Sequence, residues 1–184
     1  MYQLLDVAKG FLESMNIKED YVLCDFTMGN GYDTEYLCKK VPKGKVYAFD
    51  IQAQAVENTR KRLSDAGLTN AEIIHDSHAK VLEYVKEPIN GGMFNLGYLP
   101  GGDKSVHTMR ESTMPAIEGA ISLLKKGGIL VISIYPGHEE GTLEGQMLLE
   151  KLSQLSRFEY CVTNFRIINS PDAPFIIAVE RYDK

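Results

Sequence analysis

Short apolar runs alternate with longer amphipathic stretches along this chain. Apolar residues recur at helical spacing between Leu4 and Met15, and residues 21–26 form a short, mainly apolar run that ends in a glycine-bearing turn. A period of about 3.6 residues predicts a helix, whereas a short continuous apolar run predicts a buried strand. The same pattern predicts strands at 45–50, 71–75, 93–96 and 129–135, and helices at 33–40, 52–66, 78–85, 105–124 and 143–155.

Two more apolar runs, at 160–168 and 175–181, follow each other with no helical stretch between them. Buried strands that alternate with helices predict a parallel sheet covered by helices on both faces. Two strands joined directly predict an antiparallel hairpin at the sheet edge. We therefore expect a doubly wound, Rossmann-like α/β fold whose sheet is mostly parallel, with an antiparallel C-terminal edge strand. Because no repeat or linker interrupts the pattern, residues 1–184 are expected to form a single domain.

The composition changes this picture little. With 44% hydrophobic and 24% charged residues, it is typical of a soluble globular protein. Cys24, Cys38 and Cys161 form no CxxC pair, which fits a reducing compartment rather than a disulfide framework or a zinc site. There is no N-terminal signal pattern and no apolar run long enough to cross a bilayer, so we expect a cytoplasmic protein with no membrane partner.

The candidate chemistry begins directly after the first predicted strand, with the run Asp25-Phe26-Thr27-Met28-Gly29-Asn30-Gly31-Tyr32-Asp33-Thr34. In open α/β sheets, ligands bind beyond the carboxyl ends of the strands, and glycines let the backbone turn tightly against a ligand. Asp50 ends the second strand, where a carboxylate can accept both hydroxyls of a ribose. Asp76 ends the third strand, where an adenine amino group can be bound. Together they predict an adenosine-containing cofactor, although a glycine turn without any ligand is common.

The residues of the same loop distinguish between two classes of cofactor, nicotinamide dinucleotides and S-adenosylmethionine (SAM). A nicotinamide dehydrogenase carries GxGxxG, whose third glycine allows close helix packing around a pyrophosphate, and that position is Thr34 here. Asp25 and Asp33 would repel a pyrophosphate, but they would attract a sulfonium and an amino-acid ammonium. The loop therefore favours SAM and makes a dehydrogenase the weaker alternative.

Several segments resemble a bacterial methyltransferase family, namely residues 25–34, 49–52, 75–78, 94–104 and 135–138. Members of this family were long labelled rRNA methylases, and some are understood as tRNA 5-aminomethyl-2-thiouridine methyltransferases. They complete the 5-methylaminomethyl group on the wobble uridine. The resemblance implies a class I SAM methyltransferase fold and a SAM site lined by Asn30, Asp33, Thr34, Asp50, Gln52, Asp76, Ser77 and His78. Asp25, Thr27, Gly29 and Gly31 of the glycine loop complete the predicted cofactor site.

The run Asn95-Leu96-Gly97-Tyr98 ends the fourth strand, beside the place where the SAM methyl group should point. It resembles the Asn-Pro-Pro-Tyr motif of methyltransferases that modify exocyclic amines, but both prolines are absent, so the identity of the base does not transfer. An acceptor amine must be held by hydrogen-bond acceptors while its lone pair stays free. Asn95 can supply an oxygen and Tyr98 can stack on a base. Alternatively, Asn95 only ends a strand and Tyr98 packs in the core.

An alkylamine must lose a proton before it attacks, and a desolvated pocket lowers the pKa of the amine. Asp103, Tyr135 and His138 are the candidates for receiving or relaying that proton. Asp103 can instead anchor a loop, and a structural role for His138 is equally open. A metal site is not predicted, because His75 and His78 have no third ligand at suitable spacing.

The leading hypothesis is therefore N-methylation of 5-aminomethyl-(2-thio)uridine at the wobble position, with the tRNA anticodon stem-loop as partner. The alternatives are an rRNA or small-molecule amine as acceptor, and a non-catalytic RNA- or nucleotide-binding module. A net charge of −5 disfavours binding to nucleic acid by charge alone. Lysines and arginines nevertheless cluster at 39–45, 60–62 and 104–110, and a homodimer is one way to join such clusters into a wider basic face.

Overall fold

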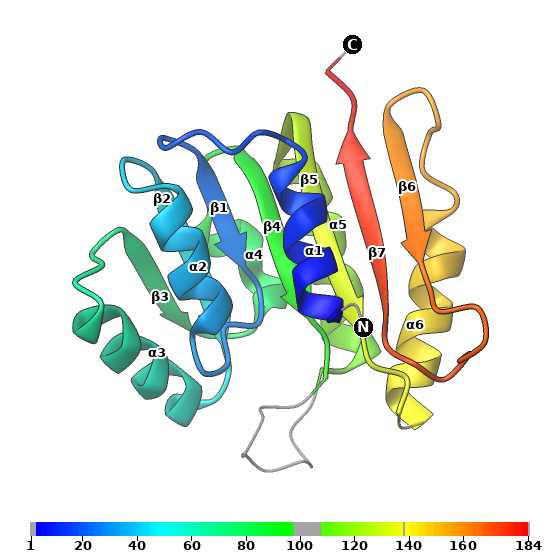
Figure 1. Ribbon diagram of the computed structural model, residues 1–184, viewed down its shortest axis with the longest axis horizontal. Helices are drawn as coiled ribbons and strands as arrows, with labels where there is room; N and C mark the ends of the chain where they lie inside the picture. The colour runs from blue at the N-terminus through cyan, green and yellow to red at the C-terminus, as the bar shows by residue number, and fades with distance from the viewer. Residues whose placement is uncertain (1–2, 98–107, 138, 184) are drawn as a thin grey trace.

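The computed structural model describes residues 3–97, 108–137 and 139–183, and these residues form one sheet with helices on both faces (Figure 1). Within them the sheet has seven strands, in the order β3-β2-β1-β4-β5-β7-β6. In chain order the strands are β1 Val22–Asp25, β2 Lys45–Asp50, β3 Ala71–His75, β4 Ile89–Asn95, β5 Leu124–Ile134, β6 Tyr160–Phe165 and β7 Phe175–Arg181. The predicted α/β fold class is confirmed.

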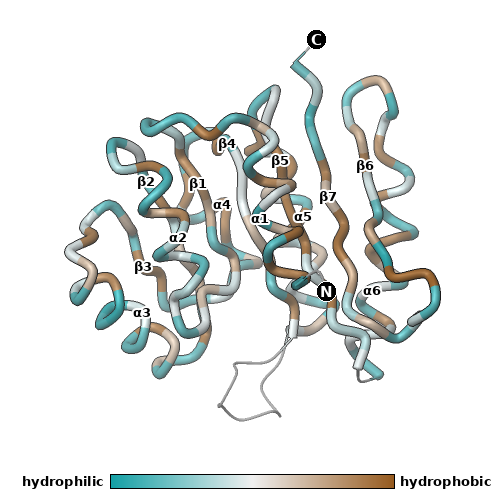
Figure 2. Tube along the Cα trace, viewed as in Figure 1, coloured by the Kyte–Doolittle hydropathy of each residue, from teal (hydrophilic) through white to brown (hydrophobic). Residues whose placement is uncertain are grey.

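The helices divide between the two faces of the sheet. They are α1 Leu4–Glu13, α2 Tyr32–Lys40, α3 Ala53–Asp65, the 3₁₀ turn η1 His78–Lys80, α4 Val81–Tyr84, α5 Arg110–Leu123 and α6 Glu139–Leu152. Helices α1, α2 and α3 pack on one face, and α4, α5 and α6 pack on the other. Figure 2 shows the hydrophobic residues concentrated along the central strands between these layers. Among the described residues, no helix is both long and apolar enough to span a membrane.

The carboxyl ends of β1 and β4 form the natural binding edge of this sheet. Strand β1 pairs in parallel with β2 on one side and with β4 on the other. From β1 the chain adds β2 and β3 on one side, and it then crosses back to add β4 and β5 on the other side, so the switch point lies between β1 and β4. Consecutive connections at this switch point run to opposite sides, which leaves a crevice outside the strand ends. Any ligand held there meets the residues that directly follow β1 and β4.

An aromatic stack supports this edge from below. The rings of Phe26 and Phe94 lie parallel with centroids 4.0 Å apart, and both side chains are buried. Gly92 makes room for them, because a Cβ at this position would lie 2.7 Å from Cε2 of Phe26. Such a pair contributes about 0.5–1.5 kcal/mol beyond the burial of its area. The stack of Phe26 on Phe94 therefore holds the backbone in place where it leaves β1.

The C-terminal strands form the predicted antiparallel hairpin at the sheet edge. Strand β7 is antiparallel to both β5 and β6, and β6 is the outermost strand. The antiparallel strand thus lies one place in from the edge.

Several element boundaries differ from the sequence prediction, and the largest shift is that of strand β5, which begins at Leu124, five residues before the expected start. Strand β4 begins at Ile89 rather than at residue 93. The prediction missed this first part of the strand because Gly91 and Gly92 have low strand propensity. Both glycines are buried where neighbouring atoms leave no room for a Cβ. The expected helix at 78–85 is a 3₁₀ turn followed by α4. Helix α6 begins at Glu139, four residues before the expected start. The predicted start of the helix at 105–124 lies outside the described residues, and Pro115 lies inside α5.

Candidate active site

The glycine loop between β1 and α2 is closed by a contact with α3. Gly31 has φ +80° at the N-terminus of α2, and a Cβ there would lie 2.9 Å from Oγ1 of Thr59. The same hydroxyl donates a hydrogen bond of 3.1 Å to the carbonyl of Gly29. Left-handed backbone and close approach together require glycine at position 31.

Asp50 links the loop to the end of β2. Its Oδ2 accepts a hydrogen bond of 3.0 Å from the Gly29 amide, and its Oδ1 accepts one of 2.9 Å from the Gln52 amide. Each carboxylate oxygen keeps a second lone pair. The side chain is therefore fixed by the backbone while it can still accept two hydroxyl groups.

Residues of α3 hold the loop from outside, and the sequence did not single them out for this role. The Asn30 side chain accepts a hydrogen bond of 2.8 Å from Nδ2 of Asn58, and the Asn30 carbonyl accepts one of 2.8 Å from Nε of Arg62. The Arg62 guanidinium also lies 3.6 Å above the ring centroid of Tyr32. Arg62 is part of the basic cluster at 60–62, so only its contact with the loop distinguishes it from the solvated cations beside it.

Two carboxylates, buried Asp25 and partly buried Asp33, lie where the loop passes the end of β4. Asp25 is 1% exposed, and its carboxylate accepts hydrogen bonds from Oγ1 of Thr34 at 2.6 Å and from the Thr27 amide at 3.2 Å. Burial, and then the charge of Asp33, raise the pKa of Asp25 to about 7. Burial also raises the pKa of Asp33, against the opposing effects of Lys9, whose Nζ lies 3.7 Å from Oδ1, and of Asn95. A cation placed between these carboxylates would relieve both penalties.

Asn95 joins the carboxylate pair from β4. Its backbone N–H donates to Oγ1 of Thr27 at 2.7 Å, and its side-chain Nδ2 donates to Oδ2 of Asp33 at 2.5 Å. Because the Asp33 carboxylate can only accept, the atom facing it must be Nδ2, and this sets the orientation of the Asn95 carboxamide. Its Oδ1 is buried and has no hydrogen-bond partner among the described residues.

Tyr135 completes this group on the β5 side. The residue directly follows β5, and its Cδ2 lies 3.9 Å from where a Cβ on Gly97 would stand. Burial, and then the charge of Asp33, raise the pKa of the Tyr135 hydroxyl. The structure thus brings Tyr135 and Asn95 together around Asp33. The other three predicted catalytic residues, Tyr98, Asp103 and His138, lie outside the described residues.

On the far side of the loop, Asp76 lies in a network of its own. Its Oδ2 accepts hydrogen bonds from Tyr84 at 2.7 Å and from Lys80 at 3.0 Å, and its Oδ1 accepts from the Ser77 amide at 2.7 Å. These bonds, led by that of Tyr84, lower the pKa of Asp76 to about 2. An ionised carboxylate with one remaining lone pair on Oδ1 can still accept an adenine amino group. Ser77 itself caps η1 through its hydroxyl.

His78 supports the loop from beneath. Its Nδ1 lies 2.9 Å from the carbonyl of Phe26, and burial lowers the pKa of the imidazole. The neutral ring therefore donates from Nδ1, and its buried Nε2 has no partner among the described residues. His75 lies apart, with Nε2 3.0 Å from the carbonyl of Ile51.

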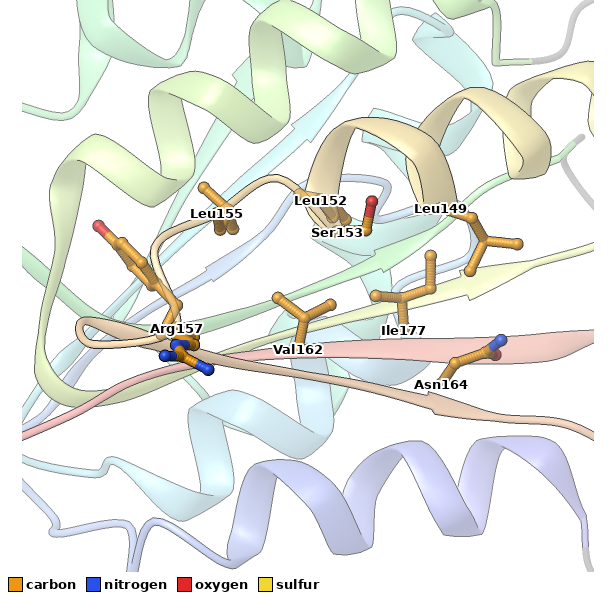
Figure 3. Close-up of a pocket in the computed structure, with 9 residues that line it drawn as sticks. Leu149, Leu152, Ser153, Leu155, Arg157, Val162, Asn164 and Ile177 are labelled. Atoms are coloured by element: carbon orange, nitrogen blue, oxygen red, sulfur yellow. The ribbon is translucent and has the colours of Figure 1, made fainter.

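A hollow of about 360 Å³ lies between α6 and the β6–β7 hairpin, away from these residues (Figure 3). Its lining is mainly aliphatic and includes Leu149, Leu152, Leu155, Val162 and Ile177. None of the predicted site residues borders it. A second hollow, of about 460 Å³, lies between α1 and the opposite face of the same hairpin. Concavity alone therefore does not mark the candidate site.

Comparison with known proteins assigns the chain to a family. The family model described as "Putative rRNA methylase" matches residues 46–180. The chain belongs to this family. A relative from Arabidopsis thaliana, the chloroplastic tRNA (mnm(5)s(2)U34)-methyltransferase, is 36% identical over 184 residues, which cover 94% of this chain and 67% of the relative.

Solved structures of similar proteins agree with this assignment. One from Clostridium thermocellum, a "putative rRNA-methylase", is 35% identical with a TM-score of 0.94, and the match covers 98% of both chains. A second, a "putative methyltransferase" from Streptococcus mutans in complex with SAH, is 34% identical with a TM-score of 0.90, and the match covers 98% of this chain and 99% of that one. The predicted family, methyltransferase class and SAM cofactor are confirmed.

Proposed function

We propose that this methyltransferase transfers a methyl group from SAM to the primary amine of 5-aminomethyl-(2-thio)uridine at the wobble position of tRNA. The observation that carries the proposal is the buried Oδ1 of Asn95, which has no partner among the described residues and is held in place by Asp33 at the end of β4. A neutral amine needs such an acceptor, whereas a carbon nucleophile does not. The relative whose name specifies a wobble-uridine methyltransferase supports this choice of substrate.

The residues after β1, β2 and β3 fit SAM. Asp25 and Asp33 favour the positive charges of the sulfonium and ammonium groups, and Asp50 has free lone pairs for the ribose hydroxyls. When bound, SAM supplies an electrophilic methyl group and leaves as a neutral thioether. The backbone of Gly29, Asn30 and Gly31 provides the close approach that such a ligand requires, and α3 holds this backbone rigid.

On the acceptor side, Asn95 positions the substrate amine. Its Oδ1 accepts one N–H of the amine, so that the amine lone pair can point at the methyl carbon. As the new N–C bond forms, the C–S bond breaks and its electron pair stays on sulfur. The product is a secondary ammonium, which then gives up a proton. Asp103, Tyr135 and His138 remain the predicted proton acceptors.

The direct test incubates purified protein and SAM with tRNA that carries the 5-aminomethyl group, followed by mass spectrometry of the nucleosides. We expect the wobble nucleoside to gain one methyl group. Titration calorimetry with SAM, and with NAD as a control ligand, is run on the same preparation. If SAM binds and the aminomethyl nucleoside remains unmodified, the wobble substrate is wrong.

A second candidate keeps the SAM site and places the amine on rRNA, which the description of the family model favours. Nucleosides from a strain lacking this chain separate the two candidates, because the missing methyl group is found either in tRNA or in rRNA. A non-catalytic module predicts instead that Asn95→Ala leaves cellular function intact. We further propose the tRNA anticodon stem-loop as partner, a cytoplasmic location and one domain, with a homodimer as the arrangement that widens the basic face.

A further inference from the structure

A second buried polar group lies beside Asn95 and takes part in none of the contacts described above. Ser133 on β5 is 1% exposed, and its Oγ has no hydrogen-bond partner among the described residues. Ser133 is the register partner of Asn95 across the parallel β4–β5 pair. Neighbours in register on adjacent strands project from the same face of a sheet. The two side chains whose oxygens lack a partner among the described residues therefore emerge side by side on the face that carries α1.

The hydroxyl of Ser133 costs stability where it stands. Its strand is otherwise aliphatic at this level, with Ile132 and Ile134 buried on either side, and the Ser133 carbonyl already accepts the Leu96 amide at 2.9 Å. A buried hydroxyl without a partner costs about 1–3 kcal/mol. An alanine would fit the same space without that cost. An unpaired polar group of this kind points to a ligand that completes it.

A primary amine in its reactive, neutral form supplies the missing partner. It has two N–H groups and one lone pair, and both N–H groups must be held if the lone pair is to keep one direction. Two acceptors that each lie about 2.9 Å from one nitrogen at tetrahedral angles stand about 4.7 Å apart. Neighbouring strands of a sheet are about 4.8 Å apart. Side chains in register across β4 and β5 therefore leave their backbones about as far apart as the two acceptors of one amine must stand.

We propose that Ser133 is the second hydrogen-bond acceptor for the substrate amine, so that Oγ of Ser133 and Oδ1 of Asn95 hold its two N–H groups together. This inference rests on the proposed function, because it takes a primary amine as the acceptor group. It also explains how the reaction would stop after one methyl group. The secondary amine product keeps only one N–H, so it leaves one of the two buried acceptors unpaired, and its methyl group meets a polar atom.

The test compares Ser133→Ala and Ser133→Cys with the wild type on tRNA that carries the aminomethyl group. We expect kcat to fall roughly 10- to 100-fold for Ser133→Ala, and less for Ser133→Cys, whose thiol is a weak acceptor. The affinity for SAM should stay unchanged. We also expect the dimethylated nucleoside to form a larger share of the product, an effect that loose packing alone would not produce.

Two further variants control for structure. Val131→Ala, one pleat away on the same face of β5, removes buried volume without removing an acceptor, and we expect it to keep wild-type kcat and product. Asn95→Ala combined with Ser133→Ala should cost less than the product of the two single effects, because both residues hold one group. Wild-type kcat and product for Ser133→Ala would overturn this inference alone. A wild type that binds SAM but leaves the amine unmodified overturns the proposed function, and this inference with it.

Discussion

The carboxyl edge of β1 and β4 and the hollow beside the β6–β7 hairpin differ in the groups they bury. The edge carries charged and polar side chains: Asp25 is almost fully buried, and Oδ1 of Asn95 has no partner in the described part of the chain. The hollow has the recognisable concave shape, but it is lined mainly by aliphatic side chains of α6 and the hairpin (Figure 3). The candidate site is thus marked by polar groups that cost stability, and shape alone does not locate it.

The hollows have a simple origin in the layer arrangement. The hairpin extends the sheet beyond β5, and α6 on one face and α1 on the other lie nearest to it (Figure 1). Two helices flanking two additional strands leave apolar surface only partly covered. The carboxyl edge, in contrast, gathers loops from β1, β2, β3 and β4, and each loop adds polar residues.

The largest effect is expected for Asn95→Ala, compared with Asn164→Ala in the lining of the hollow. Loss of the Asn95 carboxamide removes an oriented acceptor from the reacting group, and such a loss typically lowers kcat about 100- to 1000-fold. SAM affinity should change little, because the proposed SAM contacts come from the β1, β2 and β3 loops. Single-turnover rates on aminomethyl tRNA measure the first effect, and calorimetry measures the second.

Asn164 is exposed on the outermost strand, so its alanine variant should keep wild-type kcat and melting temperature. Similar losses of kcat in both variants would contradict the distinction between the two regions. Wild-type kcat in Asn95→Ala would remove the basis of the proposed acceptor site.

The next prediction concerns the charge of Asp25. Its pKa of about 7, well above the usual 3.8 of an aspartate, means that folding favours the protonated form. The contribution of Asp25 to the stability of the ligand-free protein should therefore be largest below about pH 4 and be lost as pH rises toward and through 7. SAM, which prefers the ionised carboxylate, should bind up to about tenfold more weakly for each pH unit below 7.

Asp25→Asn should flatten both profiles. At pH 8 we expect the ligand-free variant to melt above the wild type, because no buried charge remains, and to bind SAM more weakly than the wild type does. Asp172→Asn, in the exposed connection between β6 and β7, is the matched control and should keep both wild-type profiles. Calorimetry and thermal melts between pH 6 and pH 8 give the answer. A pH-independent SAM affinity in the wild type would show that Asp25 does not carry this charge.

Much of this arrangement is present in the sequence, because the fold follows from the period of the apolar residues. The cofactor half of the site follows as well, since the residues after each parallel strand meet at one edge. Asp50 and Asn95 were assigned to the candidate site in this way. Arg62 and Lys9 were not assigned to the site, because their contacts depend on how separate helices pack against the loop.

Ser133 shows a second limit of prediction from the sequence. A serine within the apolar run 129–135 is consistent with a buried strand, and nothing local indicates whether its hydroxyl has a partner. Only the register of β4 against β5 places it beside Asn95. Gly92 is similar, because its lack of a side chain matters only through the ring of Phe26. What the sequence could not predict, therefore, are contacts between elements rather than the elements themselves.

The smallest effect is expected for alanine substitutions at two glycines. Comparing them distinguishes the effect of closing the loop at the site from that of backbone strain alone. Gly31 and Gly67 both have positive φ, at +80° and +67°, but a Cβ on Gly67 would meet nothing within 4 Å, while one on Gly31 would lie 2.9 Å from Thr59. Gly67→Ala should thus cost only the left-handed backbone term, about 1 kcal/mol. Gly31→Ala should add an overpacking term of about 1–3 kcal/mol. For a chain of this size, each kcal/mol lowers the melting temperature by about 2–4 °C.

SAM affinity distinguishes the two variants further. Moving Thr59 away from an alanine at position 31 would disturb its hydrogen bond to the Gly29 carbonyl, and the Gly29 amide in turn is bonded to Asp50. We therefore expect Gly31→Ala to weaken SAM binding, and Gly67→Ala, at the far end of α3, to leave it at the wild-type value. Calorimetry below the melting temperature of both variants makes the comparison. Equal SAM affinities in the two variants would mean that α3 does not hold the loop in its binding shape, and that the loop closes around the ligand by itself.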